Sequence, residues 1–145
     1  IGNLTAAPRK RSRIGFFLPS ATLGANQRAL EEMINAGKVK SGNASVDSDL
    51  RSIGVVDDEG GIRIEDSTAF RNMAREVVDQ SPYTELWEAA RAGEFLLPVM
   101  DELTGGVYTD ETLKWRLKKV LNWGRGLGLI PDKRYKYAPR KKRSS

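Results

Sequence analysis

Apolar residues recur at spacings of three and four along most of the chain, which is the pattern of helices with one buried face. The first such run covers 26–36, where Gly37 offers a left-handed stop, and a shorter run follows near Val46–Ile53. Four more helices are predicted farther along, from their apolar stripes and from capping residues, prolines and glycines at their ends. They cover residues 67–80, 82–92, 95–103 and 109–127.

β-branched residues flank an acidic, glycine-rich turn in the first half, and this pattern predicts a β-hairpin. Ile53–Val56 and Ile62–Ile64 lie on either side of the turn at 57–61. A second hairpin is predicted near the C-terminus, where 131–134 has turn residues and 135–137 alternates like a strand. The expected fold class is therefore mainly α with short β-hairpins, an α+β fold.

The order helix, turn, helix, hairpin occurs twice, which predicts two units in tandem. An acidic unit is expected over 14–66 and a basic unit over 67–139. A flexible basic arm at 1–13 precedes them, and a basic tail at 140–145 follows.

The segment from Thr109 to Ile130, TDETLKWRLKKVLNWGRGLGLI, combines a capped helix with the start of an apolar strand. In this segment, and in its order of elements, the chain resembles the winged helix-turn-helix superfamily of DNA-binding domains over about residues 14–139. Similar helices occur in the DNA-recognition parts of restriction endonucleases and in bacterial regulators. The resemblance implies two winged helix-turn-helix units, with the helix at 109–127 lying in the major groove of DNA.

Charge is segregated along the chain behind a formal net charge of +5. Residues 1–13 carry +4, residues 14–113 carry −10, and residues 114–145 carry +11. A basic end on an acidic body is typical of proteins that bind nucleic acid. For the tail at 140–143, a solubilising role remains the plain alternative.

The polar face of the predicted helix at 109–127 supplies the candidate base contacts. Lysine is drawn to phosphates and guanine edges, and asparagine can pair with adenine. The candidates are Lys114, Trp115, Lys118, Lys119 and Asn122. The alternative is a solvated helix face with its tryptophans in the core, which we favour for Trp123 and leave open for Trp115.

The remaining cations of both ends are candidate contacts to the DNA backbone. They are Arg9, Lys10, Arg11, Arg13, Arg116, Arg125, Lys133, Arg134, Lys136, Arg140, Lys141, Lys142 and Arg143. Tyr135 and Tyr137 could stack on sugars or pack against the long helix. The first unit is a poor DNA reader because its turn and second helix are acidic.

Catalysis by this chain is not expected. There is no cysteine or histidine, which removes thiol, Ser-His-Asp and most zinc chemistry. No glycine-rich nucleotide-binding motif occurs, and the acids at 57–59 and 65–66 lack the nearby lysine of a restriction-type metal centre. We therefore expect no metal, no cofactor and no catalytic residue, with any catalytic activity on another domain or a partner subunit. The start at Ile1 suggests a processed chain or a fragment.

The expected function is sequence-specific binding of double-stranded DNA, as the recognition part of a nuclease or regulator. Two alternatives stay open. One is a protein-interaction module of a larger complex, with Trp87, Trp115 and the acidic hairpin as its binding surfaces, and the other is RNA binding by the same basic end. No apolar run approaches the roughly 18 residues of a membrane span, and because residues 1–13 lack the apolar centre of a signal peptide, we expect none there. The absence of cysteine fits a reducing compartment, the cytoplasm or the nucleoid.

Overall fold

Six helices make up most of the described part of the chain, which in this computed structural model comprises residues 16–37, 41–57, 59 and 61–138. They are α2 (Leu23–Ala36), α3 (Ala44–Ile53), α4 (Ser67–Val78), α5 (Tyr83–Arg91), α6 (Leu96–Leu103) and α7 (Asp110–Gly126). The six helices predicted from the sequence are thus confirmed, with ends shifted by a few residues. Pro98 lies in the first turn of α6, the one place where a helix accepts it without a kink.

Local side-chain chemistry explains where four of the helices begin. In each case an oxygen of the capping residue accepts a hydrogen bond from a backbone N–H of the first turn. The caps are Thr22 for α2, Asn43 for α3, Asp66 for α4 and Thr109 for α7. Two glycines, Gly37 and Gly54, then end α2 and α3 in the left-handed conformation.

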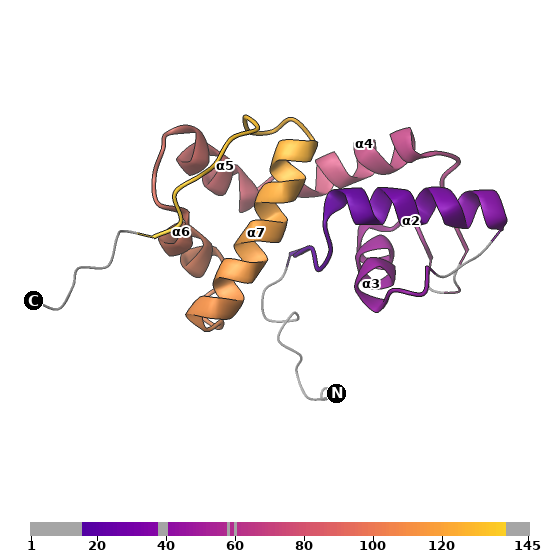
Figure 1. The fold of residues 1–145 in the computed structure, drawn as a ribbon, viewed down its shortest axis with the longest axis horizontal. Coiled ribbons are helices and arrows are strands. Elements are labelled where there is room, and N and C mark those ends of the chain that lie inside the picture. The colour runs from indigo at the N-terminus through magenta and orange to yellow at the C-terminus, as the bar shows by residue number, and fades with distance from the viewer. Residues whose placement is uncertain (1–15, 38–40, 58, 60, 139–145) are drawn as a thin grey trace, which may run out of the picture.

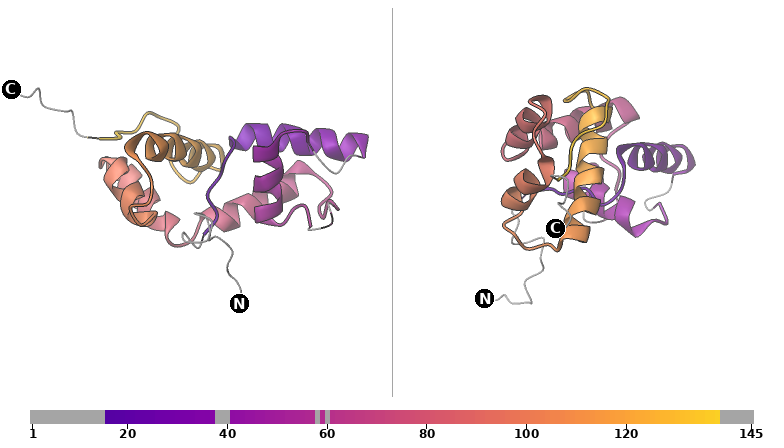
Figure 2. Two further views of the ribbon diagram at one scale, coloured as in Figure 1. Left: turned by 90° about the horizontal axis from the view of Figure 1, so that it is seen from below. Right: turned by 60° about the vertical axis from the view of Figure 1, so that its left-hand side comes forward.

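The helices form two groups that meet along α2 and α7. The first group is α2, α3 and α4, and the second is α5, α6 and α7 (Figures 1 and 2). Each group has its own fully buried side chains, such as Leu30 and Leu50 in the first and Trp87 and Leu117 in the second. Phe70 of α4 contacts Trp123 of α7 with ring centroids 6.2 Å apart, which joins the two cores.

The segment 16–22, which leads into α2, runs between the two groups. The Phe17 ring lies 5.3 Å from the Trp123 ring, and the Trp123 indole N–H donates to the Ala21 carbonyl at 2.8 Å. From the other side, Arg71 and Arg75 of α4 donate to carbonyls at the C-terminal end of α7. Helix α4 therefore contacts the second helix group as well as its own.

The first predicted hairpin is wrong as a pair of strands. Among the residues that the structure describes in this region, the β pairing is limited to an isolated antiparallel bridge between Val56 and Ile62. The Asp57 carboxylate accepts from the N–H groups of Glu59 and Gly61 and so organises the turn. The pairing does not extend into strands because Val55 and Val56 are buried in the core of the helical bundle and α4 begins soon afterwards, at Ser67.

The second predicted hairpin is wrong as well, because the backbone of 131–138 bonds to a helix and not to another strand. The carbonyls of Lys136 and Tyr137 accept hydrogen bonds from the N–H groups of Leu96 and Leu97, at 3.0 and 2.7 Å. These donors belong to the first turn of α6, where a helix has N–H groups without internal partners.

The α+β expectation is therefore corrected to an all-helical fold. The described residues contain no strand or sheet, and so neither half has the wing that defines a winged helix-turn-helix unit. Within the same residues, no helix has the length and apolar character needed to cross a membrane.

Candidate nucleic-acid interface

The open face of α7 carries a cluster of cations and one exposed tryptophan. Lys114 and Lys118 are exposed, Lys119 is half buried, and Trp115 has 43% of its surface exposed. The Lys119 ammonium lies 4.9 Å from the centroid of the Trp115 ring, within the range of a cation–π interaction. The structure thus decides the question that the sequence left open: Trp115 is a surface residue, whereas Trp123 is fully buried.

A groove separates α7 from the C-terminal segment 131–138 and extends this cationic face. Its volume is about 610 Å³. The lining residues are Lys118 and Arg125 of α7, with Asp132, Lys133, Arg134, Tyr135 and Tyr137 of the segment. Four cations therefore face one carboxylate, and we call this site the basic groove.

The cations of the basic groove are largely free of acidic partners. Over the part of the chain that the structure describes, the single ion pair joins Arg125 Nε to Asp132 Oδ1 at 3.9 Å. Arg125 also donates to the Lys133 carbonyl, which holds the segment against α7. Lys133, with its ammonium 5.5 Å from the Tyr135 ring centroid, remains exposed to solvent, as does Arg134.

Further contacts hold the C-terminal segment in place. Besides its bonds to the start of α6, the Tyr135 hydroxyl donates to the Pro131 carbonyl, and Arg91 of α5 donates to the Leu129 carbonyl. Lys136 lies over the ring of Phe95, 5.6 Å from its centroid. These contacts fix the C-terminal segment against the second helix group, so the segment forms one wall of the basic groove without being a strand.

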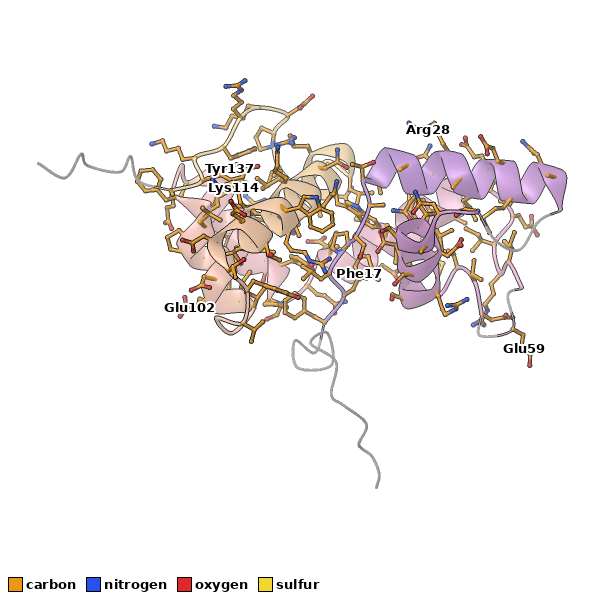
Figure 3. All side chains as sticks on the ribbon, turned by 60° about the horizontal axis from the view of Figure 1, so that its bottom comes forward. Phe17, Arg28, Glu59, Glu102, Lys114 and Tyr137 are labelled. Atoms are coloured by element: carbon orange, nitrogen blue, oxygen red, sulfur yellow. The ribbon has the colours of Figure 1, made fainter. Side chains whose placement is uncertain are left out.

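The cations of α7 and of the C-terminal segment lie in the second helix group. Figure 3 shows Lys114 and Tyr137 in the second helix group, whereas Glu59 of the acidic turn lies at the far end of the first. Glu102 of α6 lies in the second helix group as well (Figure 3), so the basic surface is confined to α7 and the C-terminal segment and does not cover the whole group.

Asn122, a predicted base contact, has a structural partner. Its side-chain oxygen accepts a 2.8 Å hydrogen bond from the Leu23 N–H in the first turn of α2. Gly126, one turn later, lies so close to Leu23 that an added Cβ would meet the leucine Cδ2 at 2.6 Å. The start of α2 therefore lies against the side of α7 that carries Asn122, and the open face extends from Lys114 to Lys119.

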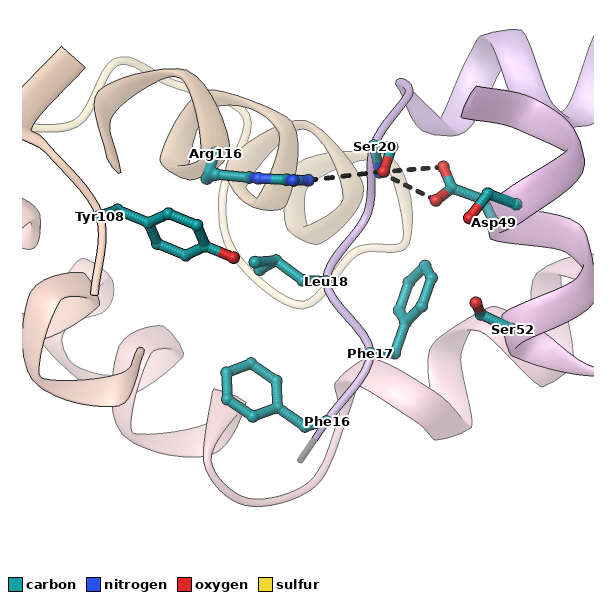
Figure 4. Close-up of a pocket in the computed structure, with 9 residues that line it drawn as sticks. Phe16, Phe17, Leu18, Ser20, Asp49, Ser52, Tyr108 and Arg116 are labelled. Carbon is teal, nitrogen blue, oxygen red and sulfur yellow. Dashed lines mark hydrogen bonds between the residues drawn. The ribbon is translucent and has the colours of Figure 1, made fainter. Parts of the chain in front are cut away.

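Arg116, a predicted backbone contact, points away from the basic groove. Its Nη1 donates to the Pro19 carbonyl and the Ser20 hydroxyl, both at 3.4 Å. The guanidinium lies between the rings of Tyr108 and Trp115, 5.7 and 5.1 Å from their centroids. It faces a cleft between the two helix groups, shown in Figure 4.

Asp49 of α3 is a buried structural carboxylate, a role that no pattern in the sequence indicates. Only 1% of its surface is exposed. Its two oxygens accept hydrogen bonds from the N–H groups of Ser20 and Ala21 and from the Asn26 amide, at 2.9–3.1 Å. Burial raises the pKa of the Asp49 carboxyl, and these hydrogen bonds oppose that rise. A helical pattern predicts that a position faces inward, but it does not show which backbone N–H groups of other segments lie within hydrogen-bond distance of it.

The candidate contacts at Arg9, Lys10, Arg11 and Arg13, and at Arg140, Lys141, Lys142 and Arg143, lie outside the described residues. Over the residues that are described, no three acidic side chains come together in a way that could hold a metal ion. No protein-family model, curated protein or solved structure matches this chain.

Proposed function

We propose that the protein binds double-stranded DNA through the basic groove and the adjoining open face of α7. The observation that carries the proposal is the concentration of solvent-exposed cations there, with one weak ion pair among the described residues. Phosphates would replace the missing acidic partners, and their binding would release condensed counterions.

The arrangement favours contact with the DNA backbone more than readout of bases. Lys118, Lys133 and Arg134 line the basic groove, where they can follow a row of phosphates. Base contacts are left to the exposed pair Lys114 and Trp115, because Asn122 is engaged with α2. Affinity is therefore expected to depend strongly on salt and only modestly on sequence.

The proposal is tested by removing two charges from the basic groove and, in a matched control, two charges from the other helix group. The first variant is Lys133→Gln with Arg134→Gln, and the control is Arg28→Gln with Arg63→Gln, all four side chains being exposed. Both variants have the same net charge. Binding to a random-sequence duplex, measured by fluorescence anisotropy, should weaken about ten-fold or more for the first variant and stay near wild type for the control.

Equal loss in the two variants would contradict the proposal, because net charge alone would then explain the binding. Absence of duplex binding by the wild-type chain at low salt would refute it outright.

A further inference from the structure

The cleft between the helix groups is a second candidate site, separate from the basic groove. It has a volume of about 360 Å³, in the range of small-molecule sites. Its walls are formed by Phe16, Phe17, Leu18 and Ser20 of the segment before α2, by Ser48, Asp49 and Ser52 of α3, and by Tyr108 with Arg116 (Figure 4).

One wall of the cleft is apolar and firmly placed. Phe16 packs edge-on against Tyr83, and Phe17 packs against Trp123, with ring centroids 5.4 and 5.3 Å apart. Leu18 continues the same wall, and all three side chains are half buried. Such a surface suits the apolar body of a small ligand.

The opposite wall carries a cation whose bonding is incomplete. Arg116 Nε is buried and has no hydrogen-bond partner, and the two bonds from Nη1 are long, at 3.4 Å. Within the described residues no carboxylate lies within ion-pair distance of this guanidinium. The charge of Asp49 attracts this guanidinium from beyond ion-pair distance, but the Asp49 carboxylate makes no hydrogen bond to it, so the buried Nε is left without an acceptor.

Asp49, the acid that also lines the cleft, does not hydrogen-bond the Arg116 guanidinium. Its oxygens are directed to the N–H groups of Ser20 and Ala21 and to the Asn26 amide, on the side of α2. The hydroxyls of Ser48 and Ser52 lie one helical turn apart on the same wall and offer donors to a bound anion.

We propose that this cleft binds a small organic carboxylate with an apolar, ring-sized body. The carboxylate would pair with the Arg116 guanidinium, a geometry in which two N–H groups meet two oxygens, and the body would lie against Phe16 and Phe17. This proposal does not depend on DNA binding.

The probe is phenylacetate, compared at constant ionic strength with its neutral isostere phenylacetamide, in a titration followed by tryptophan fluorescence. Trp115 stacks on Arg116, with its ring centroid 5.1 Å from the guanidinium carbon, and so reports on the site. We expect saturable binding of phenylacetate and at least ten-fold weaker binding of the amide. Equal binding of the two, or no saturation into the millimolar range, would overturn the proposal.

Two charge-matched variants locate the binding. Arg116→Gln should weaken phenylacetate at least ten-fold, whereas Lys114→Gln, on the exposed face of the same helix, should leave it unchanged. An Arg116→Gln protein that binds like the wild type would also overturn the proposal. If that variant does not fold, Arg116→Lys keeps the charge but loses the paired donors, and weaker binding of phenylacetate is again expected, with unchanged binding counting against the site.

Discussion

Replacing Asp49 by alanine tests whether one buried carboxylate fixes the segment that runs between the two helix groups. The substitution removes the acceptor of three donors: the N–H groups of Ser20 and Ala21 and the side-chain amide of Asn26. Each buried donor left without an acceptor costs about 1–3 kcal/mol. Because Ser20 and Ala21 are only partly buried, water can replace part of the carboxylate, so the lower end applies. The expected loss is about 3 kcal/mol in the free energy of unfolding.

The assay is urea unfolding followed by circular dichroism. For an m-value of about 2 kcal/mol/M, the midpoint should fall by about 1.5 M. Asp49→Asn keeps one oxygen acceptor and should lose less than the alanine variant. Glu32→Ala, an exposed position on α2, is the control and should stay within about 0.5 kcal/mol of wild type. An Asp49→Ala protein as stable as this control would refute the reasoning.

Three further outcomes follow from the structure. Gly124→Ala should lower the free energy of unfolding by about 1–2 kcal/mol, although alanine has the better helix propensity. The reason is that the new Cβ would lie 2.6 Å from the buried Trp87 ring. A gain in thermal stability would contradict this. Asn122→Ala removes the acceptor of the Leu23 N–H and should lower the free energy of unfolding by about 1 kcal/mol. Its affinity for DNA in an anisotropy titration should equal that of wild type. A selective loss of DNA affinity would instead make Asn122 a base contact. Burial raises the pKa of Asp49, so the folded state holds that proton more tightly than the unfolded state. The stability of wild type relative to Asp49→Asn should therefore be greatest at acidic pH and fall as the pH rises above the usual aspartate range. Urea midpoints that show the opposite trend would contradict this effect of burial.

Helices were predictable from the sequence because their signals are local. Thr109 caps α7 through its own hydroxyl, and Gly37 ends α2 through its own backbone freedom. The strands failed because the partners of extended segments lie elsewhere in the chain. Val55 and Val56 have the composition of a strand, yet they are buried among helices. The carbonyl of Lys136 accepts a hydrogen bond from the N-terminus of α6, a partner that the strand-like pattern of 135–137 does not predict.

The candidate site was predictable in composition but not in arrangement. Apolar periodicity correctly separated Lys114 and Lys118 from the buried stripe of α7. It could not show that Asn122 meets a backbone N–H 99 residues away in sequence, or that Arg116 turns toward Ser20. Such assignments depend on which helix lies beside which.

The central claim is that the basic groove holds phosphates, and the salt dependence of duplex binding tests it most directly. Affinity decreases with salt, and the slope of log affinity against log salt concentration becomes shallower by about 0.9 for each phosphate contact removed. The account predicts that Lys133→Gln with Arg134→Gln lowers the slope by roughly two, while Arg28→Gln with Arg63→Gln leaves it at the wild-type value. A slope unchanged by the groove variant would contradict the account, because the phosphates would then be bound elsewhere on the chain.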